Sequence, residues 1–175
     1  MRFAPSVLLA VCLLAHPASA ADIPPRDPGL PDPILTPGAT NPDVTQANIK
    51  STICKPNWTK TVRPSNGYFR DLKIHQLEEY GLADKALGHY EEDHLISLQL
   101  GGHPRNPKNL WPQPYNVKWG ARIKDVIESE LKRRVCKGEI TLPAAQAAIS
   151  EDWRVPYCRY VRNPKPGLCE KGNPI

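Results

Sequence analysis

The window "YEEDHLISLQLGGHPRNPKNLWPQPYN", residues 90–116, gathers the residue types of this chain that are best suited to chemistry. It contains the adjacent pair Asp93 and His94 and, further along, Asn109 and Asn116. An imidazole can accept a proton near neutral pH, and carboxylate and amide oxygens suit hard cations. An Asp-His pair in isolation is common and is more often structural, so its meaning depends on the elements that position it.

Segments with helical patterns lie on both sides of this window. Before it, the apolar residues of segment 67–82 recur near helical spacing, and Gly81 is a plausible C-cap. After it, segment 118–136 has basic residues at its end and an apolar face made of Trp119, Ile123, Val126, Ile127 and Leu131. A further helix is expected with Thr141 as its N-cap and a shared face of Ala145, Ile149 and Trp153.

Two short strands are predicted inside the window. Residues 95–100 alternate enough for a strand, which the pair Gly101-Gly102 would stop. Residues 110–114, "LWPQP", suit a brief second strand, since their prolines cannot donate to a longer ladder. Helices therefore dominate and the sheet is small, which predicts an α+β domain.

The N-terminal part of the chain indicates export. Residues 1–20 combine an early Arg2, an apolar run and a small-residue cleavage pattern, as in a secretory signal. Residues 21–48 are rich in proline and predict an extended, disordered leader. The domain then spans residues 49–175. Because no second long apolar run follows, the mature protein is expected to be secreted or periplasmic, without a membrane segment.

Four cysteines remain after removal of the signal, an even number that favours disulfides in an oxidising compartment. They allow three pairings, between which the sequence does not decide. We favour Cys54–Cys136, which would tie the start of the domain to the end of a helix, and Cys158–Cys169, which would close a short loop. Structural zinc is the alternative, and the absence of any C-x-x-C disfavours it.

The arrangement "DHLISLQLGG", then "NLW", then a helix resembles the HNH endonucleases, also called His-Me finger or ββα-metal nucleases. The stretch "NLWPQPYNVKW" is similar to the DNA/RNA non-specific branch of that superfamily. The resemblance covers about residues 90–130 and implies a ββα-metal finger core, stapled here by disulfides. Two departures are an asparagine at the helix position often held by histidine and the absence of zinc-binding cysteines.

The resemblance implies a role for each polar residue of the window. His94 would be the general base that activates water, and Asp93 and Asn116 would bind a divalent cation, most plausibly Mg²⁺. Asn109 would tie the intervening loop to the finger and orient His94. Neighbouring residues of a regular strand point to opposite faces, so we expect irregular backbone at Asp93 and His94 if both serve one metal.

The net charge of +5 mildly favours a polyanionic partner, here nucleic acid, with DNA as the expected partner and RNA as a further option. Basic side chains near the window are candidate phosphate contacts, although such residues are often simply solvated: Arg105, Lys108, Lys118 and Arg122. Two other functions stay open. One is a non-catalytic secreted module that binds a polyanion through the basic helix 118–134. The other is a zinc hydrolase using His89, His94 and His103, which the lack of an H-E-x-x-H pattern disfavours.

Overall fold

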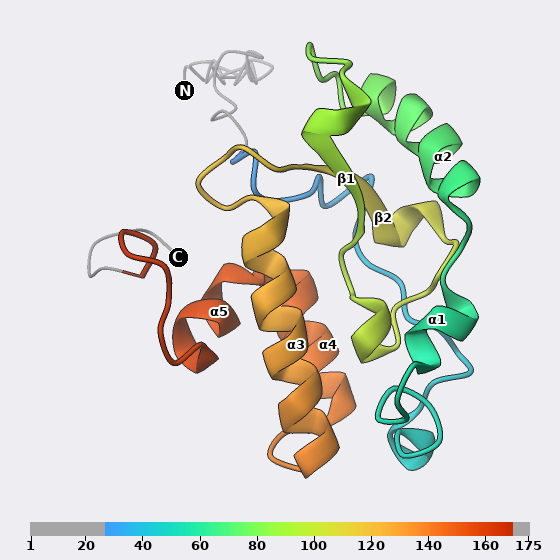
Figure 1. Cartoon of the computed structure of the whole chain (residues 1–175), viewed down its shortest axis with the longest axis vertical. Helices are drawn as coiled ribbons and strands as arrows, with labels where there is room; N and C mark the ends of the chain where they lie inside the picture. The colour runs from blue at the N-terminus through green and yellow to red at the C-terminus, as the bar shows by residue number, and fades with distance from the viewer. Residues whose placement is uncertain (1–26, 170–175) are drawn as a thin grey trace, which may run out of the picture.

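The computed structural model describes residues 27–169, so the predicted signal 1–20 lies outside it. In chain order, the helices and strands are α1 (Trp58–Val62), α2 (Asn66–Glu79), β1 (Tyr90–His94), β2 (Leu110–Pro114), α3 (Ala121–Lys137), α4 (Leu142–Asp152) and α5 (Arg154–Tyr160). Short 3₁₀ turns join several of them. Helices and one small sheet make an α+β fold, as predicted (Figure 1). Among the described helices, none has the length and apolar character needed to span a bilayer.

The sheet is a two-stranded antiparallel hairpin in which Tyr90 pairs with Pro114 and His94 with Leu110. The second strand confirms the prediction for residues 110–114, whereas the first lies earlier than predicted. Residues 95–100 are not a strand: Ser97 caps a 3₁₀ turn at Leu98–Leu100. Their apolar side chains are buried in a compact turn. The alternating apolar pattern of residues 95–100 therefore reflects the burial of their side chains in a turn, and not a strand.

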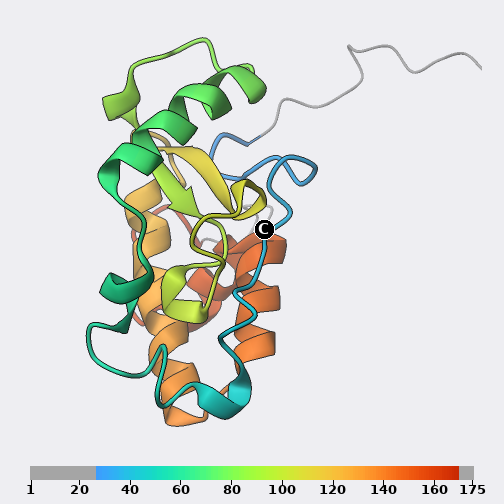
Figure 2. The same ribbon diagram turned by 90° about the vertical axis from the view of Figure 1, so that its right-hand side faces the viewer.

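The hairpin lies between α2 and the helices that follow it (Figures 1 and 2). The ring of Phe69 on α2 contacts His94, and the ammonium of Lys124 on α3 contacts Asp93. These neighbouring side chains of β1 thus point to opposite faces, as regular strand geometry requires. The irregular backbone expected at this position does not occur within β1.

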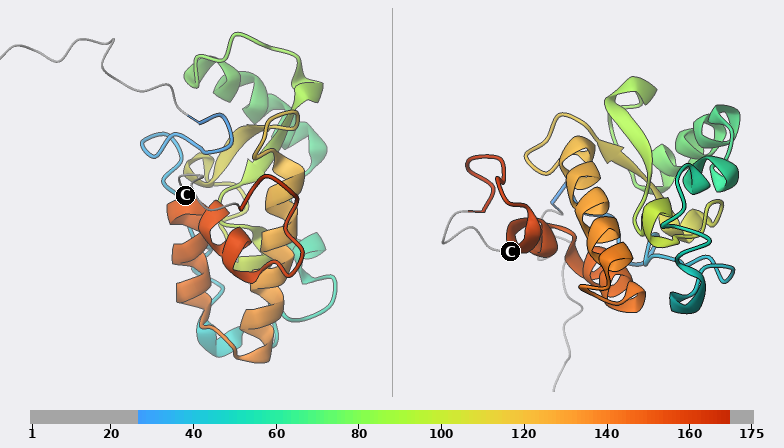
Figure 3. Two further views of the ribbon diagram at one scale, coloured as in Figure 1. Left: turned by 90° about the vertical axis from the view of Figure 1, so that its left-hand side faces the viewer. Right: turned by 60° about the horizontal axis from the view of Figure 1, so that its bottom comes forward.

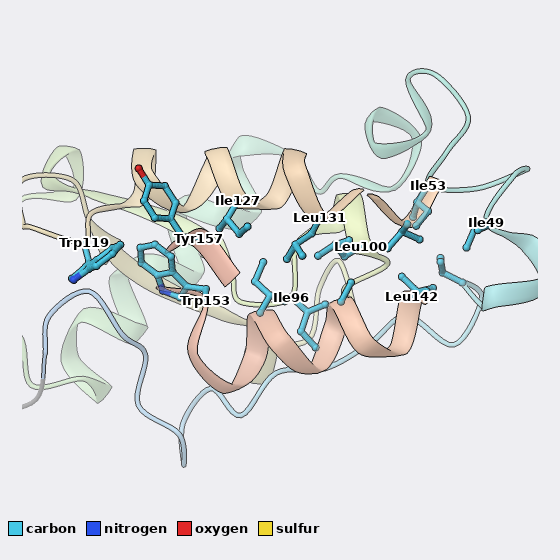
Figure 4. Packing of buried hydrophobic residues seen from close by; sticks show 14 of the residues in the cluster. Ile49, Ile53, Ile96, Leu100, Trp119, Ile127, Leu131, Leu142, Trp153 and Tyr157 are labelled. Carbon is cyan, nitrogen blue, oxygen red and sulfur yellow. The ribbon is translucent and has the colours of Figure 1, made fainter. Parts of the chain in front are cut away.

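The main apolar core lies between α3 and α4, which run side by side, with α5 packed against both (Figures 3 and 4). Trp119, Trp153 and Tyr157 meet edge to face at one end of this core. Thr141 caps α4 as predicted, since its hydroxyl accepts from the Ala144 N–H. The prediction that Val126 belongs to the apolar face of α3 is wrong. Val126 is 45% exposed, because α3 turns it away from α4 and α5.

Residues 27–48 differ from the expected disordered leader, because they pack along the domain. The Trp153 indole donates to the carbonyl of Gly29, and the hydroxyl of Thr36 donates to the carbonyl of Leu110. Val44 is buried in the core. Proline keeps this segment extended, and the few donors and apolar side chains that it offers are sufficient to hold it against the domain.

Both expected disulfides are present. Cys54–Cys136 joins residues 82 positions apart, and Cys158–Cys169 joins residues 11 positions apart. The first bond closes the longer loop, so it removes more conformational entropy from the unfolded chain. Structural zinc on these cysteines is thereby excluded.

Candidate functional site around His94

His94 is the last residue of β1, and its ring is enclosed by α2 and by the loop that follows the strand. Its Nε2 lies 3.0 Å from the carbonyl oxygen of Pro104. A carbonyl only accepts, so Nε2 carries the proton of the neutral ring and Nδ1 keeps its lone pair. Burial lowers the pKa of His94 to about 4, with the nearby charge of Arg63 acting in the same direction. At neutral pH the imidazole is therefore an uncharged base.

Asn109 holds the loop that carries Pro104. It is fully buried, and its Oδ1 accepts from the backbone N–H groups of Ile96 and Ala39. Its Nδ2 donates to the carbonyls of Ile96 and His103, next to the Pro104 carbonyl that binds the imidazole. These hydrogen bonds tie the start and the end of the loop together, which is the contact pattern that the resemblance implies for this residue.

Two glycines let this loop close on itself. Gly101 has φ of +70°, a conformation that residues with a side chain rarely adopt. A Cβ on Gly102 would lie 1.6 Å from the Ile96 carbonyl oxygen and 2.8 Å from Asn109 Nδ2. The Gly-Gly pair therefore allows the close backbone approach on which the Asn109 contacts depend.

Asp93 forms a buried ion pair that the sequence did not predict. The Lys124 ammonium lies 2.8 Å from Asp93 Oδ2 and 2.5 Å from Glu128 Oε1, and donates to the His94 carbonyl at 2.7 Å. Ser97 donates to the other Glu128 oxygen. Burial alone would lower the pKa of Lys124, but the two carboxylates outweigh it and raise that pKa well above its usual value. The ammonium thus donates hydrogen bonds to Glu128 and to the His94 carbonyl and forms an ion pair with Asp93.

The sequence of α3 contains a pattern that fits this ion pair, but the same pattern fits an exposed pair as well as a buried one. Lys124 and Glu128 are spaced i, i+4, and both occupy the helix face that also holds Ala121, Ile127 and Leu131. Such a spacing is most often an exposed pair, so only the apolar neighbours on the same face indicate burial. The contact of Lys124 with Asp93 on β1 joins distant parts of the chain, so the spacing of residues along α3 could not predict it.

Asn116 does not join Asp93. It is exposed and follows β2, two residues beyond Pro114, which pairs with Tyr90 at the far end of β1 from His94. At about 3.3 Å per residue, Asp93 lies about 10 Å along β1 from Tyr90, the residue that faces Pro114. With the Asp93 carboxylate already held by the Lys124 ammonium, the predicted metal pair does not form a shared site. Within residues 27–169, no group of three or more His, Cys, Asp or Glu side chains is arranged to hold a metal ion.

The four predicted phosphate contacts fall into two separate places. Arg105 and Lys108 lie on the loop near His94, where the Arg105 guanidinium stacks over the ring of Tyr68. Lys118 and Arg122 lie beyond the opposite end of the hairpin, and Arg122 stacks over Tyr115. They do not make one continuous basic surface around His94.

The remaining histidines of the window have local contacts. The Nδ1 of His103 accepts from the N–H groups of Arg105 and Asn106, so this side chain orders its own turn. His89 is exposed and pairs with Asp84 at 2.5 Å. Neither points to a shared zinc site with His94.

Glu92 on β1 is buried and Glu91 is half-buried, although adjacent glutamates are most often solvated. Glu92 is 6% exposed and its carboxyl oxygens have no hydrogen-bond partner in the described structure. Burial raises its pKa to about 8. Burial also raises the pKa of Glu91, to about 7, with the charge of Asp93 acting in the same direction. Both line a groove along the free edge of β1.

The environment of His94 predicts an acid-dependent loss of stability. Its folded pKa of about 4 lies below the ordinary value of 6.5, so its neutral form stabilises the fold fully above pH 6.5. That contribution, about 3 kcal/mol, is lost as the pH falls from 6.5 toward 4. Glu91 and Glu92, whose pKa values are raised by folding, have the opposite effect: they lower the free energy of unfolding as the pH rises over an overlapping pH range. The measurement is therefore the difference in free energy of unfolding between the wild type and His94→Gln, determined by urea unfolding at several pH values. A pH-independent difference would contradict the prediction.

Comparison of this chain with protein-family models, with curated proteins and with solved structures finds no significant match to any of them.

Proposed function

We propose that this chain is an exported endonuclease that hydrolyses phosphodiester bonds of nucleic acid, with His94 as its general base. The observation that carries the proposal is the hydrogen bond from His94 Nε2 to the Pro104 carbonyl, on a loop fixed by Asn109. It fixes the tautomer and leaves Nδ1 able to accept a proton at neutral pH. The two disulfides fit an oxidising compartment, in agreement with export.

In the proposed reaction, Nδ1 takes a proton from a water molecule as that water attacks the phosphorus atom. The bond from phosphorus to the leaving oxygen breaks, and that oxygen takes a proton from solvent or from the imidazolium. His94 is only 3% exposed, so a substrate reaches Nδ1 after the side chains that cover the residue, Phe69 among them, have moved.

The resemblance also predicts Mg²⁺, and Asp93 and Asn116 together do not fit it, because a lysine ammonium already occupies the Asp93 carboxylate. No step is therefore assigned to a metal bound by this pair. A requirement for a divalent cation remains part of the proposal, to be tested as a variable of the assay.

The test is cleavage of supercoiled plasmid and of labelled RNA by the purified mature protein, with Mg²⁺, Mn²⁺ or Zn²⁺ and with EDTA. His94→Gln and His94→Ala are expected to lose at least about 100-fold in rate, the usual contribution of a general base. His75→Ala, at an exposed histidine of α2, is the matched control and should cleave normally. Unchanged digestion by folded His94 variants, or no digestion by the wild type with any metal, would reject the proposal.

A second candidate is a non-catalytic module that binds a polyanion on the same scaffold. It is favoured by the burial of His94 and by the ion pair between Asp93 and Lys124, which occupies the Asp93 carboxylate. This function predicts salt-dependent retention of DNA in EDTA, with intact DNA recovered after incubation with metal. Cleavage that depends on His94 would exclude it as the main function.

A further inference from the structure

A groove of about 420 Å³ runs along the free edge of β1, on the side where α2 begins. Most of its polar lining comes from the linker before α2, from α2 itself and from β1. The linker and α2 lie outside residues 90–130, the part of the chain that the resemblance to HNH nucleases covers. The lining residues used below are Arg63, Phe69, Arg70, Lys73, Glu91 and Glu92. None of these residues was a candidate for binding nucleic acid on sequence grounds.

Two exposed arginines line the groove. Arg63 and Arg70 are both exposed, and neither makes a side-chain hydrogen bond or an ion pair within the described part of the chain. Lys73, by contrast, is held in place by the carbonyls of Leu87 and Tyr90. The groove therefore carries one fixed cation and two guanidinium groups that are able to bind an anion in a forked geometry.

A buried acid faces the same groove. Both carboxyl oxygens of Glu92 are enclosed and lack a hydrogen-bond partner among the described residues. Because burial raises the pKa of Glu92 to about 8, its side chain is mainly protonated at neutral pH and has a donor with no acceptor. A buried donor of this kind costs free energy unless a ligand supplies the acceptor. An oxygen-rich anion in the groove would meet this need.

We propose that this groove binds a phosphate group of nucleic acid, held by the guanidinium groups of Arg63 and Arg70 and by the carboxyl group of Glu92. Phe69 forms one wall, where an aromatic ring can stack with a base. The charge of Arg63 also acts on His94, so a phosphate bound to Arg63 lies toward the proposed base. In naming nucleic acid as the source of the phosphate, this inference rests on the proposed function.

The test is the binding of a fluorescently labelled oligothymidylate to the full mature chain in EDTA, followed by anisotropy. Arg63→Gln combined with Arg70→Gln is expected to weaken binding at least about ten-fold through the loss of charge-assisted contacts. Arg162→Gln, at an exposed arginine beyond α5, is the matched control and should bind like the wild type. Equal affinity of the double variant and the control would overturn the proposal, whatever the cleavage assay shows. Binding of inorganic phosphate without binding of the oligonucleotide would overturn the assignment to nucleic acid.

The role of Glu92 is tested by pH. Between pH 7 and 9 its ionisation would place a negative charge against the phosphate, so wild-type affinity should fall about ten-fold. Glu92→Gln stays neutral and should keep its affinity over this range. The other groups facing Glu92 are Tyr68, Arg70 and Lys73 from α2, Arg63 from the linker, and Glu91 and Asp93 from β1. They are common to both proteins, so a parallel decline in the two proteins would overturn the role given to Glu92.

Discussion

Replacing Lys124 with methionine is expected to lower the free energy of unfolding by about 3–5 kcal/mol, because it leaves buried carboxyl groups without their cation. The ammonium of Lys124 contacts Asp93, Glu128 and the carbonyl of His94, and its side chain is 1% exposed. Methionine fills a similar volume, so the loss reports charge and hydrogen bonding with little contribution from a cavity.

The expected pH dependence separates this effect from a packing defect. Burial raises the pKa of both Asp93 and Glu128 even with Lys124 present, and removing the cation raises both further. A carboxyl whose pKa is raised by folding destabilises the protein as the pH rises above its unfolded value. The loss should therefore be larger at pH 7 than at pH 4.

Urea unfolding at both pH values measures this loss, with Lys132→Met on the same helix as the control. Lys132 has no ion pair in the described structure, so its replacement should change the free energy of unfolding by less than about 0.5 kcal/mol. Adding Asp93→Asn and Glu128→Gln to Lys124→Met should recover part of the loss. A Lys124→Met protein as stable as the control would show that the ion pair contributes nothing.

Local patterns predicted α2, α3 and α4 better than they predicted the start of the hairpin, and they did not predict the short helices α1 and α5. Thr141 caps α4 as predicted, whereas the C-cap of α2 is Tyr80 and the predicted Gly81 follows it with φ of +61°. Both signals act within a few residues, so they are readable from the sequence alone. The choice between β1 at Tyr90–His94 and a strand at 95–100 depends instead on pairing with residues 110–114. Polar residues in β1 lack the alternation of a half-exposed strand because helices cover both of its faces.

The same limit applies to the candidate site. The resemblance selected His94 and Asn109 as candidates within one short window, and hydrogen bonds inside that window hold both side chains. Arg63 and Arg70 come from a different part of the chain, and only folding brings them to the edge of β1. A motif can identify the residues of its own loop, but it does not identify residues that reach that loop through tertiary packing.

Asn109→Ala is expected to be the most informative change in the loop, because it separates the support of His94 from His94 itself. It removes four hydrogen bonds and leaves the N–H and C=O groups of buried Ile96 without partners. The expected loss in free energy of unfolding is about 2–4 kcal/mol, from unsatisfied buried backbone groups. Asn106→Ala, which removes only a local contact to the Lys108 N–H, should cost less than about 1 kcal/mol.

The consequence for His94 can be measured directly by NMR of the ring nitrogens. In the wild type the proton should lie on Nε2, because that atom faces the Pro104 carbonyl, and the pKa should lie well below 6.5. Without Asn109 the loop at His103 and Pro104 loses its anchor, so both tautomers should appear and the pKa should rise as water reaches the ring. Cleavage by this variant should then fall even where the protein remains folded. An unchanged tautomer and pKa in folded Asn109→Ala would show that Asn109 stabilises the loop without orienting the histidine.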